Sequence, residues 1–365
     1  MTGDRAKALS WHGVSTVARQ EFVLRIRAGR WRWLLGVWFV LVTGFTVLVH
    51  VSVRASFGDA DSKGVVVYGS LVLFVLALAL LVVPSLTGQS VNGDRERGTL
   101  ATLQVTRLSA LEIALGKLGA AWGTAVSFLL LALPAVAYSM ALGGVPLTRV
   151  VVVSAVMALL LGVVAALALC LSSLLARSTT SGVLSYLTVF ALTIGTLVMF
   201  GIGAATSTEN VTKQSTCPTR EDLVQQDVPP DMIERLLGSC EVSTYETTQT
   251  RTDHVWWLLA PNPFVIVADA APQLAKETAA ERRARQALEE QGIHRQDLRS
   301  SDPLGAIGRG VRDLRKEPGA PASERKPVWP FGLAFDLLLA AGAVWLTSRR
   351  LHAPSRALPR GQRVA

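Results

Sequence analysis

Six long apolar runs limit what this chain can fold into. Each run has 19 to 26 residues, and the only charged residue within them is Asp336 in the last run. Because a helix rises about 1.5 Å per residue, each run is long enough to cross a hydrocarbon core of about 30 Å. The runs cover residues 33–53, 65–86, 118–142, 150–175, 182–205 and 328–346. The sequence therefore predicts an all-α polytopic membrane protein with six transmembrane helices.

Basic residues flank the runs unequally. Seventeen Lys and Arg residues lie in the N-terminal segment, the second-to-third connection, the turn after the fourth run and the C-terminal tail, against three (Arg54, Lys63, Arg149) on the opposite short loops. Since Lys and Arg near span ends stay on the cytoplasmic side, we expect both termini to be cytoplasmic and the protein to lie in the cell membrane. The net charge of +9 then indicates contact with anionic membrane lipids, and we expect no nucleic-acid partner.

The spacing of the runs divides the chain into five parts. We expect a cytoplasmic N-terminal segment with an interfacial amphipathic helix, helices one to five with a coupling segment, a long extracytoplasmic loop with a re-entrant apolar segment, helix six, and a basic cytoplasmic tail. In that order these are residues 1–32, 33–205 (coupling segment 88–117), 206–327 (re-entrant segment 254–271), 328–347 and 348–365.

Two helix faces can be predicted from spacing. Ala18, Phe22, Ile26 and Trp33 recur on one side of a helix before the first run, flanked by arginines, which is typical of a helix lying in the membrane interface. The pair Gly119 and Gly123 has the GxxxG spacing that lets another helix approach closely. We interpret this pair as internal packing in preference to a dimer contact.

The long loop contains one apolar stretch and two cysteines. Residues 254–271 are mostly apolar but contain Pro261 and Pro263. A seventh full crossing would move the basic tail outside, so we expect a re-entrant or interfacial hairpin. Cys217 and Cys240 would form a disulfide if the loop is extracytoplasmic, and two unpaired thiols are the equal alternative.

Catalytic patterns are missing from the sequence. The five histidines show no HExxH spacing, and no CxxC pair occurs, so we expect neither a metal site nor a bound cofactor. The string around Lys117 lacks the glycine and the Ser or Thr of a P-loop, which predicts no ATP site and no enzyme activity in this chain. Asp336 would contact a substrate or gating partner, or would form a hydrogen bond near the outer interface, and both readings remain open.

The second-to-third connection has its own pattern. Gly93 and Gly98 are predicted to break the chain around a charged run, after which Thr99 caps a short helix bearing Leu100 and Leu103 on one side. Ser109 and Glu112 then form a capping box that starts the third transmembrane helix. An exposed short helix suits docking to a partner, while a loop whose charges only enforce topology fits equally well.

Several residues of this connection carry a family resemblance. They are Glu96-Arg97-Gly98-Thr99-Leu100, Thr106, Leu108-Ser109, Glu112-Ile113 and Leu115-Gly116-Lys117. Together with the six-span order, they resemble the permease (membrane) subunits of ABC-2 type exporters over most of residues 14–350. Arg107 and Ala110 depart from the pattern, where such proteins often have a proline and a basic residue.

The resemblance implies a transport subunit without its own ATPase. Two copies, or this chain and a similar permease, would form the pathway, each docked to a separate ABC ATPase subunit that uses the ATP. The implied coupling residues are Glu96, Gly98, Thr99, Leu100, Leu103 and Glu112. A non-transporting membrane scaffold whose long loop binds a partner is the alternative from another class, followed by a secondary transporter. Nothing in the sequence selects a substrate.

Overall fold

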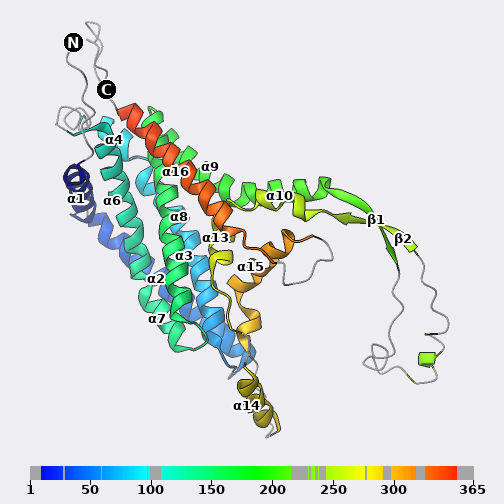
Figure 1. The fold of residues 1–365 in the computed structure, drawn as a ribbon. Coiled ribbons are helices and arrows are strands. Elements are labelled where there is room, and N and C mark those ends of the chain that lie inside the picture. Colours follow the sequence, from blue (N-terminus) through cyan, green and yellow to red (C-terminus); the bar gives the residue numbers. More distant parts are fainter. Residues whose placement is uncertain are drawn as a thin grey trace.

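Six helices are long and apolar enough to cross a membrane. The structure is a computed structural model that describes residues 10–27, 29–58, 60–96, 98, 108–214, 229, 232–234, 237, 244–275, 278–290, 297–317 and 325–351. The six helical stretches are Trp31–Phe57, Lys63–Glu96, Ala110–Ala141, Leu147–Leu174, Ser178–Thr206 and Trp329–Leu351. Each coincides with one predicted run, so the prediction of a helical membrane protein with six candidate spans is confirmed (Figure 1).

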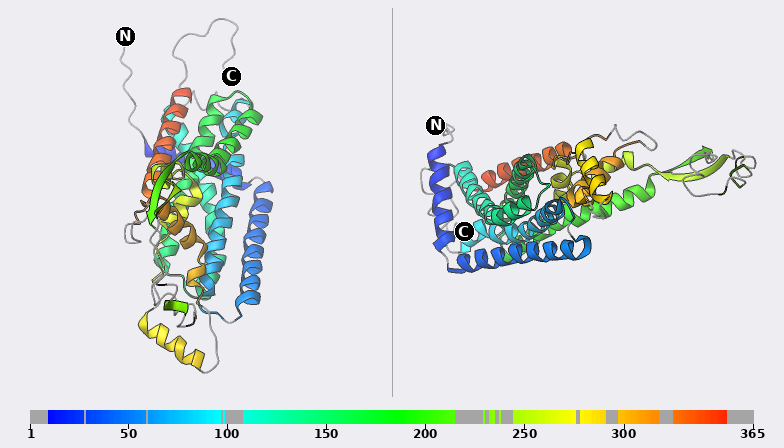
Figure 2. Two further views of the ribbon diagram at one scale, coloured as in Figure 1. Left: turned by 90° about the vertical axis from the view of Figure 1, so that its right-hand side faces the viewer. Right: turned by 90° about the horizontal axis from the view of Figure 1, so that it is seen from below.

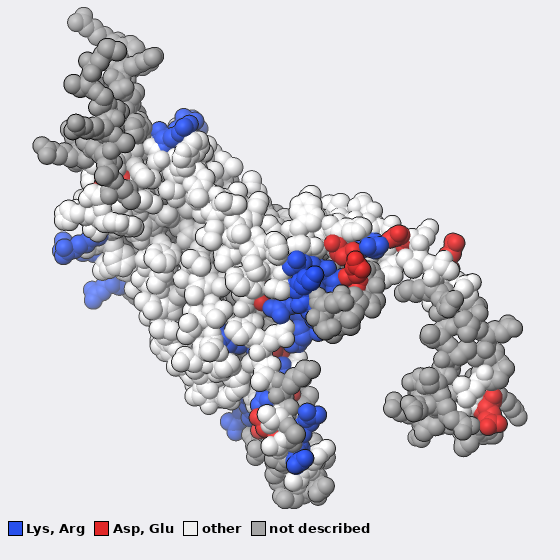
Figure 3. Space-filling view, viewed as in Figure 1, with Lys and Arg blue, Asp and Glu red and all other residues white. Residues whose placement is uncertain are grey.

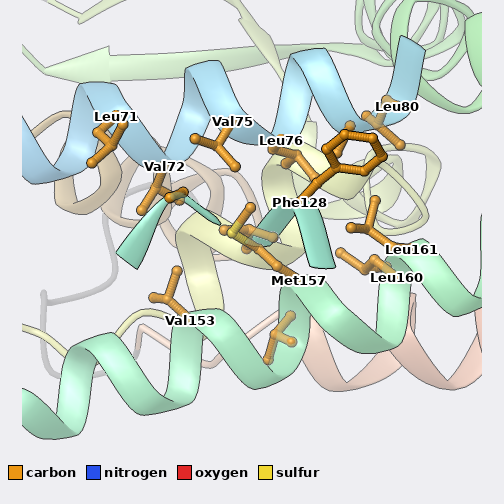
Figure 4. Close-up of a cluster of buried hydrophobic side chains, with 14 of the residues drawn as sticks. Leu71, Val72, Val75, Leu76, Leu80, Phe128, Val153, Met157, Leu160 and Leu161 are labelled. Atoms are coloured by element: carbon orange, nitrogen blue, oxygen red, sulfur yellow. The ribbon is translucent and has the colours of Figure 1, made fainter. Parts of the chain in front are cut away.

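Helices α3, α6 and α8 supply most of the core. They span Lys63–Thr87, Ala110–Leu131 and Leu147–Leu174. Figure 4 shows Leu76 of α3, Phe128 of α6 and Leu161 of α8 converging with their neighbours on one buried cluster. Charged atoms lie mostly at the ends of the bundle and over the segment before the last helix, leaving an uncharged flank (Figure 3). Such a flank is what a hydrocarbon environment requires.

The N-terminal helix α1, Trp11–Arg27, crosses the end of α2, Gly29–Phe57, at a steep angle (Figure 2). It packs on the glycine face of α6, where a Cβ added to Gly116 would lie 2.6 Å from Val17 Cβ and one added to Gly119 would lie 3.6 Å from Ala18 Cβ. The interpretation of the α6 glycines as internal packing is therefore confirmed. Val17 is buried where α1 packs on α6, whereas Ile26 of the predicted apolar stripe is exposed on the chain. The placement of that stripe in the membrane interface stays a prediction.

The third and fifth candidate spans are each interrupted within the apolar run. The third breaks at Ala132, and a second helix, α7, Leu133–Ala141, begins with Pro134 in its first turn, because proline fits a helix start. The fifth contains a π-helix, η1, Ala191–Gly195, between α9, Ser178–Phe190, and α10, Thr196–Thr206. Helix α9 packs on α3 and α8, whereas α10 leaves the bundle (Figure 1).

The segment between the fifth and sixth spans has more structure than its sequence predicts. Strands β1, Thr208–Gln214, and β2, Thr244–Thr250, pair antiparallel with Thr208 opposite Thr250, so the fold is not purely helical. Threonine-rich alternation suits such a ribbon. After β2 come two 3₁₀ turns, η2 Thr252–His254 and η3 Trp256–Leu258, and then helices α13, α14 and α15 with one more 3₁₀ turn, η4. The bounds of these last elements are Pro263–Ala270, Ala279–Glu290, Pro303–Leu314 and Leu298–Ser301.

The apolar stretch 254–271 does not form a continuous seventh span. Its helix α13 is buried against α8, α15 and α16, Trp329–Leu351. Asn262 caps α13 by accepting from the amide of Phe264 at 2.9 Å, and the carboxylate of Asp269 accepts from the amides of Val328 and Trp329 at the start of α16. The stretch is therefore apolar because it packs inside this chain, and its re-entrant placement stays a prediction.

Candidate functional site

A buried lysine joins three helices where the second-to-third connection meets the bundle. Lys117 of α6 is 1% exposed, and its ammonium donates to the carboxylates of Glu21 in α1 and Asp94 in α4, Ser90–Glu96. A third contact reaches the Ser90 carbonyl oxygen at 3.5 Å. Because an unpaired buried ion costs several kcal/mol, the two carboxylates offset the cost of burying Lys117 in this position.

Helix α4 is also bound to the end of α8. The Ser172 hydroxyl accepts from the backbone amides of Val91 and Asn92 at 3.1 and 3.2 Å. The Arg95 guanidinium donates to the carbonyl oxygens of Ser173 and Leu175 at 3.2 and 3.3 Å. First-turn amides and last-turn carbonyls have no partners within their own helices. These contacts supply partners for two such amides of α4 and for two carbonyl groups at the end of α8, and so hold α4 against α8.

The predicted capping box is confirmed, and its glutamate also binds the start of α1. Ser109 Oγ accepts from the Glu112 amide at 3.2 Å, and Glu112 Oε2 accepts from the Ser109 amide at 2.7 Å. Glu112 Oε1 accepts from the Ser10 amide at 2.7 Å. One carboxylate thus orders the starts of both α6 and α1. We call Glu21, Asp94, Glu112, Lys117 and Ser172 the polar clamp.

The sequence-predicted coupling residues lie next to the polar clamp or outside the described residues. Glu96 is exposed at the end of α4. Gly98 is exposed with φ of 72°, a backbone conformation that favours glycine. Thr99, Leu100 and Leu103 lie outside the described residues, so their helix stays a prediction.

One part of the sequence interpretation of this connection is wrong. Gly93 does not break the chain but is buried inside α4. Asp94, which belongs to the charged run after Gly93 in the sequence, is buried and paired with Lys117. The signal for the clamp was Lys117 itself, because a lysine at the edge of an apolar run needs a partner. In the sequence, Lys117 was considered as a flanking basic residue, as a P-loop residue and as part of the family pattern, but not as a member of an ion pair.

Asp336 and the cysteines, which the sequence also singled out, do not belong to the polar clamp. Asp336 is 1% exposed in α16, and its Oδ1 has no hydrogen bond with any residue in the described part of the chain. Neither reading of its role is tested. Cys217 and Cys240 lie outside the described residues, and Cys170 is a buried free thiol.

A second buried ion pair joins the long loop to the bundle. Arg149 of α8 is 1% exposed, and its Nη2 lies 2.5 Å from Oδ2 of Asp302, which also caps α15 by accepting from the Gly305 amide. A Cβ added to Gly69 of α3 would lie 2.7 Å from Pro303 Cδ, so α15 begins in close contact with α3 as well. The sequence assigned Arg149 only to an outer flank.

The polar clamp links four helices through ion pairs and helix caps. Within the described ranges, no group of three or more His, Cys, Asp or Glu side chains is placed to hold a metal ion. The clamp contains a lysine held between carboxylates and helix caps, with no nucleophile paired to a base. No protein-family model and no curated protein matches this sequence.

Proposed function

We propose that this chain is the membrane-spanning permease subunit of an ATP-driven ABC-2 type exporter and works with a separate ATPase subunit. The observation that carries the proposal is the polar clamp, which ties the start of the coupling segment to α1, α6 and α8 through Lys117 and Ser172. A force applied by a partner at Glu96 to Leu103 would reach three helices together. The family resemblance of the same segment supports this assignment.

In this proposal the partner uses ATP and the clamp carries the movement. Closure of the ATPase pair would push the predicted helix around Thr99 to Thr106, and the contacts of α4 would pass that displacement to α8 and α6. Binding of ATP then favours one of two arrangements of the spans, and a ligand shifts such an equilibrium only by its differential affinity for the two states. Substrate export follows if inward and outward states alternate.

A second permease and lipids are the proposed neighbours of the spans. In support, only 11% of the apolar window of the fifth span is buried within the chain and 17% of that of the first. The large exposed side chains of the fifth span include Leu187, Phe190 and Leu197. Either an identical or a similar permease would cover part of this surface, leaving the remainder to lipid.

Replacing Leu100 and Leu103 with Asp should remove the ATPase subunit from the complex. Two charges on the proposed docking face cannot be buried without a large cost. In a detergent pull-down, we expect recovery of the ATPase to fall at least tenfold while membrane insertion is unchanged. The matched control is Thr179→Asp with Thr180→Asp, which adds the same charges at exposed positions in the first turn of α9. Equal recovery from both variants would contradict the coupling assignment.

Transport itself is tested in proteoliposomes. We expect flux of candidate substrates only when the ATPase subunit and ATP are both present. Flux from purified permease without any nucleotide-hydrolysing partner would favour the secondary transporter.

Alkylation of intact cells tests the proposed topology. A membrane-impermeant maleimide should label Cys217 and Cys240 after reduction, because the proposal puts the loop outside and both termini in the cytoplasm. The Cys217→Ser, Cys240→Ser variant keeps only the buried Cys170 of three cysteines and should stay unlabelled. Labelling that requires permeabilised cells would reverse the orientation.

A membrane scaffold is the second candidate, and one observation favours it. The β1–β2 ribbon projects away from the helical bundle (Figure 1). Its register leaves the outer edges of both strands without a ladder partner in the described residues, and such edges can pair with another chain. The proteoliposome assay separates the two, because a scaffold moves no substrate.

A further inference from the structure

An apolar groove lies between the fifth span and the start of the sixth. Its volume is about 540 Å³. Gly195 and Met199 line the groove from the fifth span. Trp256 and Pro261 line it from the segment between β2 and α13, and Phe331 and Phe335 line it from α16. The groove is open at the surface of the chain, and nearly all of the residues that form it are apolar.

The π-helix accounts for the groove. A π-helix leaves carbonyl groups without their usual partners in the helix. Asn262 donates from Nδ2 to the Thr193 carbonyl oxygen at 2.7 Å and to Thr196 Oγ1 at 2.9 Å. This holds residues 256–262 against the bend, whereas α10 beyond it diverges from the bundle (Figure 1). The wedge between the diverging helix and α16 is the groove.

A positive charge lies at the edge of this apolar groove. The Arg315 guanidinium is 4.6 Å from the Trp256 ring centroid and 4.7 Å from that of Phe331, two of the rings that line it. Its Nη1 donates to the Pro327 carbonyl oxygen at 2.5 Å. No described carboxylate forms an ion pair with Arg315, so its charge is not neutralised by a described residue.

The surroundings of Arg315 are basic, as Figure 3 shows over α15. Two carboxylates in this region form ion pairs with other arginines: Asp269 pairs with Arg312, and Asp313 pairs with Arg325. The Arg325 guanidinium holds the pKa of Asp313 below its ordinary value. Three further cations near Arg315 in sequence also lack an ion pair with any described residue. They are Arg309, Lys316 and Lys326.

We propose that this groove binds one acyl chain of an anionic phospholipid, with the lipid phosphate paired to Arg315. An acyl chain satisfies the apolar walls, and a net negative headgroup satisfies the unneutralised cations beside them. A zwitterionic headgroup contains its own positive group, so its attraction to Arg315 is weaker than that of an anionic headgroup. A second copy of this chain meeting the same face about a two-fold axis would bring two basic surfaces together, which disfavours that occupant.

Lipid titration followed by native mass spectrometry tests the proposal. Detergent-purified protein should bind phosphatidylglycerol about fivefold more tightly than phosphatidylcholine, the ratio expected for one basic residue at a headgroup. Gly195→Leu should weaken binding of both lipids, because the larger side chain fills the groove. Its backbone position tolerates a Cβ, with the nearest atom 3.6 Å away. The matched control is Gly201→Leu in α10, where an added Cβ meets nothing within 4 Å.

The charge is tested separately. Arg315→Gln should abolish the preference for phosphatidylglycerol, and Arg315→Lys should keep it, since lysine preserves the cation beside the rings. Lys316→Gln removes the same charge one residue away. It should leave the preference within about twofold, because Lys316 does not lie over any aromatic ring of the described residues. An unchanged elution volume in size-exclusion chromatography confirms that each variant folds.

Three outcomes would overturn the proposal. Wild-type lipid binding by Gly195→Leu would show that the acyl chain of the lipid binds outside this groove. A retained preference in Arg315→Gln would assign the headgroup to another cation. Conversion of a dimer to a monomer by Gly195→Leu, with no lipid displaced, would identify a second copy as the occupant. None of these outcomes bears on ATPase docking, which is measured by the pull-down of the Leu100 and Leu103 variant.

Discussion

Substitution of Lys117 by Met should lower the free energy of unfolding by about 3 kcal/mol, the lower end of the range for breaking a buried ion pair. Methionine fills a similar volume but leaves Glu21 and Asp94 facing each other without a cation. Their side chains are 22% and 11% exposed, so water relieves part of the repulsion. Thermal unfolding in detergent should show a midpoint about 5 °C lower.

The reason for this loss can be isolated by neutralising the carboxylates. The triple variant Lys117→Met, Glu21→Gln, Asp94→Asn should recover most of the stability, because no uncompensated charge remains. Lys117→Arg should stay close to the wild-type midpoint if the larger guanidinium can be accommodated between the same two carboxylates. A Lys117→Met protein as stable as the wild type would mean that the ion pairs do not hold α1, α4 and α6 together.

Substitution of Arg149 by Met should release the start of α15 from the bundle. The expected cost is again about 3 kcal/mol, because Asp302 is left as a buried charge whose side chain is only 2% exposed. Hydrogen exchange at the amides of α15 should accelerate by about a hundredfold, while exchange in the middle of α3 changes little. The effect should be local because Asp302 belongs to the loop and Arg149 to the span.

Two variants make this second expectation specific. Arg149→Met with Asp302→Asn should restore slow exchange, since asparagine still caps the helix and carries no charge. Arg325→Met breaks the ion pair with Asp313. The side chains of Arg325 and Asp313 are 33% and 39% exposed, so this variant should change the free energy of unfolding by less than about 1 kcal/mol. Equal effects of Arg149→Met and Arg325→Met would show that burial of the first pair is unimportant.

Periodicity and local signals predicted the parts that depend on neighbours in sequence. The six apolar runs fixed the candidate spans, and the capping box at Ser109 fixed the start of α6. The glycines of α6 indicated close packing, although their partner is α1 and not another span. Each of these signals acts within one helix, where spacing translates directly into geometry.

Pairings between distant segments could not be predicted in the same way. Arg149 and Asp302 are 153 positions apart, and Lys117 and Glu21 are 96 apart. Residues 254–271 predict a re-entrant or interfacial hairpin because their composition is apolar, and this placement stays a prediction. The sequence did not indicate that α13 would be buried by three other helices of the same chain. Composition reports that a segment avoids water but does not identify what covers it.

The sequence by itself therefore determined the number of candidate spans, their lengths and the start of the third, because hydrocarbon thickness and backbone hydrogen bonding constrain each helix separately. Only the tertiary structure decided which charges are buried as pairs, that α4 is held by α8, and that the bent fifth span leaves a groove beside Arg315. These features arise from the relative placement of whole helices. That placement is set by the summed packing of many side chains, which no single stretch of sequence specifies.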